Sequence, residues 1–408
     1  MAIRKKWRLT KPLRARIRAG HPWIYDRAIA PPAGLAAGDL ATLVDDDGPL
    51  ATVFADPGSP IRARVLDLDP DAAIDGTWAR GRAEAASQRR ARDPLLVGCT
   101  GRRLIHGEAD GCPGLVVDHY VDTAVIVFDG PAAAAVWRPR LADVLAGLER
   151  GGHTIAHAWL RGERRDRKSR LGRDAQHRAS GTEVDAVNAE AVRGAPPQEI
   201  VISEDEARFA VDVRAGQKTG FFLDQRDNRR TIRRHAAGLS VLNVFSYTGG
   251  FSLHASLGGA THVTSVDVAA PALEGLARNV ELTGLPAEAH ERICGDAFDV
   301  FARSAQRGRR WDLVIVDPPS FAPSEKAKPA ALSAYRKLAG AALRVVEPGG
   351  RFALASCSSH VTEADLLEVV AGLAPLRLRL AAGAASDHPV LPAFPEGRYL
   401  KFLFFDVE

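Results

Sequence analysis

An acid and a cysteine each follow a strand-like apolar run in the C-terminal half of this sequence. Asp317-Pro318-Pro319-Ser320-Phe321 comes directly after the unbroken apolar residues 313–316, and Cys357 follows the weaker run 351–356. Such runs are typical of strands buried on both faces. If the two strands are parallel neighbours, the Asp317 carboxylate and the Cys357 thiol lie at one rim of a sheet, where open α/β sheets bind ligands. The pair predicts covalent chemistry on a flat heterocycle beside a cofactor.

Three further loops offer the contacts that a nucleoside cofactor requires. Residues 241–245 predict a strand that runs into Ser246-Tyr247-Thr248-Gly249-Gly250, where glycines allow close backbone approach and the following helix presents free amides. Asp267 ends the next predicted strand and is placed to accept hydrogen bonds from ribose hydroxyls. Asp296 ends the third, where its carboxylate can accept from an adenine amine while Phe298 covers the ring.

Each of these residues also has a purely structural explanation. A glycine pair often makes a simple turn, and an aspartate after a strand is often a helix N-cap. Three such loops in register make that explanation less favoured. The segment has neither a G-x-G-x-x-G fingerprint nor a lysine-bearing phosphate loop. A ribose site and an adenine site without a phosphate cradle indicate S-adenosylmethionine as the cofactor.

The order of predicted elements gives the fold class and three domains. From residue 198 to 408 strands alternate with helices, which indicates a doubly wound, Rossmann-like α/β domain with a parallel sheet and right-handed crossovers. Residues 1–72 hold short strands separated by turn signals and predict a β-rich domain. Residues 73–197 predict a small α+β domain that ends in a charged loop, 161–197, which we interpret as mobile.

The composition is that of a globular protein without a membrane span. Of 408 residues, 46% are hydrophobic and 25% are charged, and no apolar run approaches the roughly 18 residues needed to cross a bilayer. The N-terminus lacks the apolar segment of a secretory signal, which predicts a cytoplasmic protein. The four cysteines, Cys99, Cys112, Cys294 and Cys357, show no metal-binding spacing, so we expect neither a metal site nor a disulfide.

Basic residues gather in two segments. Residues 1–27 hold nine arginines and lysines, among them Arg4, Lys5, Lys6 and Arg8, against one acid, and residues 161–180 hold eight against three acids. Patches of this kind are the usual electrostatic footprint of phosphate binding. The alternative, a solvated tail and a flexible loop, stays open because the net charge is only +4.

Several motifs together resemble one family. They are Gly20-His21-Pro22-Trp23-Ile24-Tyr25 and the segments 106–111, 113–118, 216–226, 243–251, 317–321 and 356–358. Over nearly its whole length the chain resembles the bacterial class I methyltransferases that make 5-methylcytosine in 23S ribosomal RNA. Members of that family carry an N-terminal PUA RNA-binding domain, a small α+β middle domain and a Rossmann-like catalytic domain.

The resemblance implies a role for the motif residues. It implies that Cys357 is the catalytic nucleophile and that Asp317 contacts the edge of the target base. The residues expected at the cofactor are Phe222, Asp224, Arg226, Asn243, Phe245, Tyr247, Gly249, Asp267, Asp296, Ala297 and Asp317. Together with the basic N-terminus, the residues expected at RNA are Arg4, Lys5, Lys6, Arg8, His21, Trp23 and Lys326, although Lys326 is equally well explained as a solvated lysine.

Two features depart from what the resemblance leads us to expect. The basic segment 161–180 is longer and more charged than in the family, which leaves the edge of the middle domain uncertain. Other RNA cytosine-5 enzymes carry a second cysteine after the Asp-Pro-Pro-like motif, where this chain has Ser320. That absence is usual for the resembled family.

The implied reaction is methyl transfer from S-adenosylmethionine to carbon 5 of a cytosine, which becomes nucleophilic only after a thiolate adds at carbon 6. The alternatives are a methyltransferase that acts on a guanine or adenine nitrogen, and a non-catalytic RNA-binding protein of ribosome assembly. Ser320 disfavours adenine because an aromatic residue usually follows the prolines there, and Cys357 disfavours guanine, which needs no thiol. The base that takes the carbon-5 proton, the modified nucleotide and a homodimer stay open.

Overall fold

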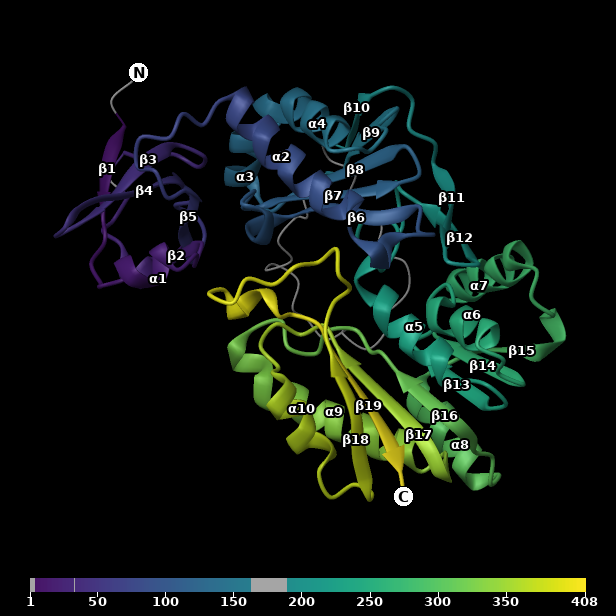
Figure 1. Cartoon of the computed structure of the whole chain (residues 1–408). Coiled ribbons are helices and arrows are strands. Elements are labelled where there is room, and N and C mark those ends of the chain that lie inside the picture. Colours follow the sequence, from purple (N-terminus) through teal and green to yellow (C-terminus); the bar gives the residue numbers. More distant parts are fainter. Residues whose placement is uncertain (1–3, 33, 163–188) are drawn as a thin grey trace.

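The computed structural model describes residues 4–32, 34–162 and 189–408, which form three large sheets flanked by helices and one separate β-hairpin (Figure 1). The N-terminal sheet has five strands in the order β1-β3-β4-β5-β2. Its elements are β1 (Lys5–Arg8), α1 (Arg14–Arg18), β2 (Trp23–Tyr25), β3 (Leu40–Asp45), β4 (Gly48–Ala55) and β5 (Ile61–Asp67). Trp7, Ile17, Leu43 and Val53 meet in its core, because alternate strand residues point to the same face.

The middle sheet has the order β10-β9-β8-β7-β6, and helices α2 and α4 pack against each other beside it. The helices approach closely because α4 carries Gly147, where a Cβ atom would lie 2.3 Å from the Arg80 carbonyl oxygen. The elements are α2 (Gly76–Ala91), β6 (Gly101–His106), β7 (Leu115–Tyr120), β8 (Thr123–Phe128), α3 (Pro131–Trp137), α4 (Leu141–Arg150), β9 (His157–Leu160) and β10 (Glu190–Arg193).

The charged loop expected over residues 161–197 needs a correction at its C-terminal end. Glu190–Arg193 is strand β10, and it pairs antiparallel with β9 at the edge of the middle sheet. Its short, polar sequence gave no strand pattern, because an edge strand can be completed by backbone hydrogen bonds alone. Most of the basic segment 161–180 lies outside the described residues.

The C-terminal domain is Rossmann-like, as the alternation of elements predicts. Its seven strands have the order β15-β14-β13-β16-β17-β19-β18. Five neighbouring strands run parallel to one another, namely β15, β14, β13, β16 and β17. The elements are α5 (Arg226–Arg234), β13 (Ser240–Val244), α6 (Gly250–Leu257), β14 (His262–Asp267), α7 (Ala270–Thr283), β15 (His290–Cys294), α8 (Ala297–Gln306), β16 (Trp311–Val316), α9 (Lys328–Leu343), β17 (Val346–Ser356), α10 (Glu363–Val370), β18 (Leu376–Ala382) and β19 (Lys401–Val407).

The expectation of an all-parallel sheet is wrong for one strand. β19 pairs antiparallel with both β17 and β18. No α-helix connects β18 to β19, and a parallel neighbour needs a crossover that returns the chain to the same end of the sheet. The helix-free connection therefore allows β19 to run in the opposite direction.

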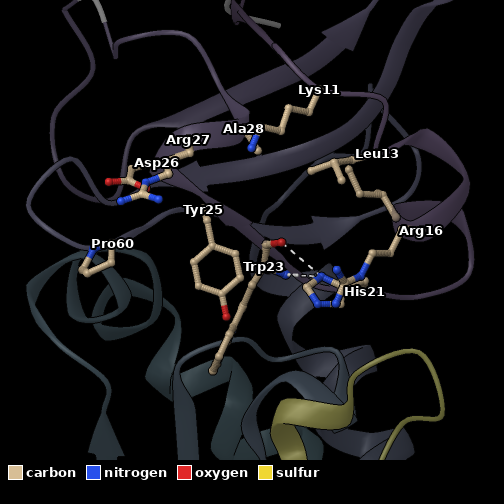
Figure 2. Close-up of a pocket in the computed structure, with 11 residues that line it drawn as sticks. Lys11, Leu13, Arg16, His21, Trp23, Tyr25, Asp26, Arg27, Ala28 and Pro60 are labelled. Atoms are coloured by element: carbon tan, nitrogen blue, oxygen red, sulfur yellow. Dashed lines mark hydrogen bonds between the residues drawn. The ribbon is translucent and has the colours of Figure 1, made fainter. Parts of the chain in front are cut away.

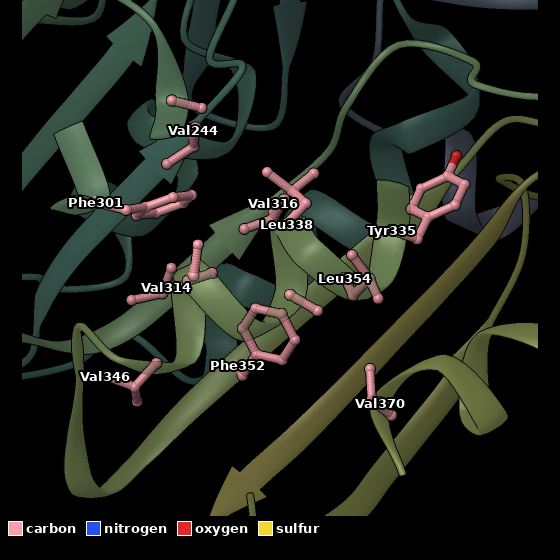
Figure 3. Close-up of a cluster of buried hydrophobic side chains, with 14 of the residues drawn as sticks. Val244, Phe301, Val314, Val316, Tyr335, Leu338, Val346, Phe352, Leu354 and Val370 are labelled. Carbon is pink, nitrogen blue, oxygen red and sulfur yellow. The ribbon is translucent and has the colours of Figure 1, made fainter. Parts of the chain in front are cut away.

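Helices cover both faces of this sheet. One face packs against α8, α9 and α10, with Phe301, Tyr335 and Leu338 meeting Val314 and other strand residues (Figure 3). The opposite face packs against α5 and α6. Side chains on both faces of the central strands are buried, which explains the continuous apolar runs in the sequence.

A β-hairpin and helix α5 precede the sheet and are absent from the predicted order of elements. The hairpin of β11 (Glu199–Glu204) and β12 (Ala207–Asp212) packs between the middle sheet and α7. Arg226 and Arg229 of α5 are fully buried and form ion pairs with Glu204 at the tip of the hairpin. Buried charges of this kind hide helix α5 from hydropathy patterns.

The connection from β18 to β19, residues 383–400, reaches out of the C-terminal domain toward the other two (Figure 1). Arg90 of α2 donates to the Asp387 carbonyl oxygen at 2.9 Å, and the rings of Trp23 and Phe394 lie 4.6 Å apart. We call residues 383–400 the connecting segment. No helix in the described part of the chain is long and apolar enough to cross a membrane.

Candidate active site

Asp317 and Cys357 lie at the same rim of the C-terminal sheet, as their sequence context predicts. Asp317 directly follows β16 and Cys357 directly follows β17, and these strands are parallel neighbours with Val316 opposite Leu354. Hydroxyl groups join the two loops, since Ser320 and Ser358 are hydrogen-bonded at 3.0 Å. The acid and the thiol therefore face one site.

The Asp317 carboxyl is held close to its protonation midpoint at neutral pH. Burial, and then the neighbouring Asp224 carboxylate, raise the pKa of Asp317 to about 7. The side-chain amide of Gln225 donates to Asp317 Oδ2 at 2.9 Å. A carboxyl in this state can donate a proton or a hydrogen bond to the edge of a base.

Asp224 is the fixed negative charge of the site. Burial alone would raise its pKa, but the Lys218 ammonium next to it holds the pKa of Asp224 well below its usual range. The Tyr399 hydroxyl donates to the same carboxylate at 2.7 Å. The other oxygen, Asp224 Oδ1, is buried and has no hydrogen-bond partner among the described residues.

Lys218 and Phe222 lie beside Asp224 in the site. The Lys218 ammonium lies 4.5 Å from the centroid of the Phe222 ring, and that ring meets the Tyr247 ring edge-on at 5.4 Å. The aromatic faces and the carboxylate form an environment that favours a cation. The motif 216–226 thus reaches both the acid loop and the loop after β13.

The surroundings of Cys357 oppose its ionisation. Burial and the nearby Asp317 raise the pKa of the Cys357 thiol. Its loop is fixed by the Tyr335 hydroxyl, which donates to Ser356 Oγ at 2.8 Å. Since a thiol reacts as its thiolate, the site needs a positive charge to activate Cys357.

The loop between β13 and α6 has an unusual backbone. Phe245 and Tyr247 have φ angles of 62° and 48°, in the left-handed region that non-glycine residues rarely adopt. Gly249 has φ 86°, and a Cβ atom there would lie 2.6 Å from Leu276 Cγ. Strained residues often cluster where a ligand is bound, because the surrounding fold must hold them in place.

The loop after β14 is bonded to this one. Asp267 Oδ2 accepts the Tyr247 amide at 2.8 Å, which ties the second loop to the first. Asn243 is buried, and its Oδ1 has no partner among the described residues. Asp296 caps α8 by accepting the Phe298 amide at 2.8 Å, so the structural explanation considered for this residue is real.

These residues fit S-adenosylmethionine. Buried oxygens without partners at Asp224 and Asn243 can accept from its amino group or its other donors. Asp267 ends the second strand of the site, and Asp296 follows the third. Ala297 is buried at the start of α8, while Phe298 is 45% exposed beside it and free to cover a ring. The site supplies carboxylates and aromatic faces for a positively charged nucleoside.

Arg226 and Arg4 lie elsewhere than their predicted roles require. The Arg226 guanidinium is fully buried and bonds Asp387 Oδ2 at 2.9 Å and the Gly101 carbonyl, so it faces the domain junction rather than the cofactor loops. Its charge is matched by a buried acid, which the sequence does not reveal. Arg4 donates to Thr52 and to the Ala72 carbonyl, which makes it a brace within the N-terminal domain.

Among the other predicted RNA contacts, the three lysines and Arg8 lie on the surface, whereas His21 is buried and Trp23 is half-buried. Arg8 pairs with Asp46, and Lys5 Nζ donates to the Gly34 carbonyl. Lys6 is exposed on β1, and Lys326 is exposed in the short 3-10 helix Glu325–Ala327, near the catalytic rim. The positive charge that the basic N-terminus offers to RNA is therefore reduced, because Arg8 is paired with Asp46.

A cavity of about 530 Å³ opens beside His21 and Trp23 in the N-terminal domain (Figure 2). Its wall combines the aromatic rings of Trp23 and Tyr25 with the basic side chains of Lys11, Arg16 and Arg27. The Trp23 indole N–H donates to Glu108 of the middle domain at 2.8 Å. Aromatic and cationic groups in one cavity suit a base and its phosphates.

Sequence reasoning assigned no role to Gln225, Tyr399 or Lys401, which all contact the site or its loops. Lys401 had a visible signal, because a lysine at the start of the apolar run 402–405 is unusual unless its charge has a buried function. Tyr399 had none, and Gln225 lay within the motif 216–226 without a pattern that assigns it a role. Their contacts with Asp224 and Asp317 join segments that are distant in the sequence.

Comparison with known proteins agrees with this geometry. Residues 143–404 match the family described as S-adenosylmethionine-dependent methyltransferase, and residues 8–68 match the PUA-like domain. The chain belongs to the S-adenosylmethionine-dependent methyltransferase family. The predicted cofactor, Rossmann-like fold and PUA-like domain are confirmed.

This methyltransferase has relatives that match over almost their whole length. A protein from Deinococcus radiodurans named ribosomal RNA large subunit methyltransferase is 36% identical, over 100% of this chain and 98% of its own. One from Cronobacter sakazakii named ribosomal RNA large subunit methyltransferase I is 34% identical, over 93% and 94%. A putative methyltransferase solved in complex with SAH has the same fold, with a TM-score of 0.82 and 21% identity over 99% of this chain and 100% of its own.

Proposed function

We propose that this methyltransferase modifies carbon 5 of a cytosine in 23S ribosomal RNA through a covalent bond to Cys357. One observation carries the proposal. A thiol and a carboxyl with a pKa of about 7 lie at the ends of neighbouring parallel strands, beside the loops of the cofactor site. Methylation of a ring or exocyclic nitrogen needs no thiol, whereas carbon 5 of cytosine does.

The thiolate of Cys357 adds to carbon 6 of the base, so that a sulfur–carbon bond forms and the 5,6 double bond is lost. Asp317 gives its proton to the ring edge near nitrogen 3 and thereby balances the charge that the thiolate brings. Carbon 5 becomes the nucleophile. Bound S-adenosylmethionine supplies the electrophilic methyl group.

Release reverses the addition. A base takes the proton at carbon 5, and the electron pair of that bond restores the 5,6 double bond and expels the Cys357 thiolate. The ring edge returns its extra proton to Asp317. Pro318 and Pro319 keep the acid loop rigid because proline fixes its own φ angle.

The choice of ribosomal RNA is supported by the names of the relatives and by the cavity beside Trp23. Single-stranded or loop RNA suits the site, since a base must leave any stack to reach Cys357 and bases in A-form duplexes are poorly accessible. Contacts at the N-terminal domain offset the cost of unstacking, a few kcal/mol.

The test is a strain that lacks this gene, complemented with wild type or Cys357→Ala. Mass mapping of 23S RNA fragments should show one 5-methylcytosine that is absent with Cys357→Ala, while purified Cys357→Ala still binds S-adenosylmethionine. RNA with 5-fluorocytosine at that position should trap a covalent adduct with the wild type only, because fluorine cannot leave as a proton does. Restored methylation by Cys357→Ala, or a product methylated on nitrogen, would refute the proposal.

A further inference from the structure

A buried lysine stands next to the loop of the proposed nucleophile. Lys401 begins β19 and lies opposite Ser356 in the antiparallel pairing with β17, one residue before Cys357. It is only 6% exposed. A lysine is rarely buried to this extent without a partner for its charge.

The hydrogen bonds of Lys401 fix two segments of the site. Its ammonium donates to the Ser358 carbonyl oxygen at 2.6 Å and to the Tyr399 carbonyl oxygen at 2.8 Å. The first bond holds the loop just after Cys357. The second holds the end of the connecting segment, where the Tyr399 hydroxyl reaches Asp224.

These partners leave the charge of Lys401 unneutralised. In the described chain no carboxylate forms an ion pair with Lys401, and Asp365, the acid that faces it from α10, is paired with Lys328 at 2.8 Å. Burial lowers the pKa of Lys401 to about 8, so the ammonium persists at neutral pH and is lost as the pH rises through 8.

The other groups that face Cys357 oppose its ionisation or cancel one another. Asp317 after β16 raises the pKa of the thiol, and so does Asp224. Lys218 lowers it, but its ammonium is bound directly to Asp224. Tyr335 of α9 is neutral, because burial raises the pKa of its hydroxyl.

We propose that Lys401 is a positioning residue for the reaction, whose buried ammonium holds the Cys357 loop in place and favours the thiolate. Deprotonation of Cys357 places a negative charge near an ammonium that has only carbonyl partners. The Lys401 ammonium and the Cys357 thiolate interact by charge, and a nearby opposite charge commonly shifts an ionisation by one unit or more. The inference rests on the proposed role of Cys357 as nucleophile, but it concerns the free enzyme.

The test measures thiol ionisation without methyl transfer. The full-length protein is alkylated with iodoacetamide between pH 6 and pH 10, and the rate at the Cys357 peptide is followed by mass spectrometry, which separates it from Cys294 at the surface. Lys401→Met and Lys401→Gln should react about tenfold more slowly at pH 7. Lys401→Arg, which keeps the charge, and Lys337→Gln, a change at an exposed lysine of α9, should stay within twofold of the wild type.

A purely structural role predicts a different result. If Lys401 only braced the loop, the alkylation profile of Lys401→Gln would coincide with that of the wild type even when activity falls, and that outcome overturns the proposal. Lys401→Gln keeps an N–H donor for the Ser358 carbonyl. If Lys401→Met does not fold, Lys401→Gln therefore still decides between the two roles.

The wild type provides a test without any variant. Because Lys401 loses its proton near pH 8, the rate should rise less than tenfold per pH unit between pH 8 and pH 9. A full tenfold rise would also overturn the proposal. A failure of Cys357→Ala to abolish methylation would instead refute the proposed function, while this profile would stand.

Discussion

The side-chain amide of Gln225 donates to Asp317 Oδ2 at 2.9 Å, and Gln225 in turn accepts from Asn228 at 2.6 Å. A segment that precedes the catalytic sheet therefore orients the acid that follows its central strand. The hydrogen bond favours the ionised form, yet burial and Asp224 outweigh it and keep the pKa of Asp317 near 7. Because these effects oppose each other, Asp317 is present near neutral pH both as a protonated hydrogen-bond donor and as an ionised acceptor.

Asp317→Asn should remove activity but stabilise the protein at neutral pH. An amide cannot give a proton to the ring, and the loss of a general acid typically costs about 10²–10⁴-fold in rate. The folded-state pKa of Asp317 lies above the unfolded value, so its ionisation opposes folding as the pH rises from about 4 to 7. At pH 8 the variant should gain on the order of 2 kcal/mol, since one pKa unit corresponds to about 1.4 kcal/mol and relaxation reduces the full shift.

Urea unfolding of wild type and Asp317→Asn at pH 8 and at pH 4 measures this difference. The gain should be present at pH 8 and should vanish at pH 4, where the carboxyl is protonated in the folded protein. Equal stabilities at pH 8 would show that Asp317 is not held near neutrality.

The rim that carries Asp317 and Cys357 was predictable from sequence because two-sided burial leaves unbroken apolar runs, and parallel strands end at one edge. The positions of the buried charged residues were not predictable from the sequence. Arg226 and Arg229 look like surface residues of a polar helix, but they are buried against Glu204 and Asp387. Charge matching between distant segments has no periodic pattern, so it cannot be read from the sequence.

The direction of β19 illustrates the same limit. The apolar run 402–405 predicts a strand correctly, but pairing direction depends on the path of the connecting segment, which is anchored by contacts such as Asp387 with Arg90. Those contacts also bring Tyr399 and Lys401 to the site.

Asp224→Asn should weaken S-adenosylmethionine binding by tenfold or more. The buried Asp224 Oδ1 lacks a partner, and its negative charge suits a cationic ligand in a low-dielectric site. Titration calorimetry measures the change, with Asp71→Asn as a control at an exposed acid of the N-terminal domain. Unchanged affinity in Asp224→Asn would mean that this carboxylate serves only Lys218 and Tyr399.

Asp296→Ser separates the two explanations for this residue. Serine caps helices about as well as aspartate, so the variant should keep the thermal stability of the wild type, whereas Asp296→Ala should lose about 1 kcal/mol. If Asp296 also accepts from the adenine amine, Asp296→Ser should bind S-adenosylmethionine several-fold more weakly. A variant with full affinity would leave Asp296 as an N-cap of α8 alone.

The cavity beside Trp23 should contribute more to RNA binding than the basic β1 strand. Lys11 and Arg27 line the cavity and are exposed, whereas Arg8 already pairs with Asp46. Lys11→Glu with Arg27→Glu should weaken binding of a 23S RNA fragment and lower the salt slope by about one to two units, since each lost phosphate contact removes roughly 0.7–0.9 of a unit.

Charge reversal at Lys5, Lys6 and Arg8 is the comparison, and it changes the charge of the domain by more than the cavity variant does. It adds the same sign of charge to the same domain but leaves the cavity intact, so it should reduce affinity and slope less than the cavity variant does. Filter binding at several salt concentrations distinguishes the two. If the β1 variant has the larger effect, RNA follows the strand and the cavity is not its principal contact.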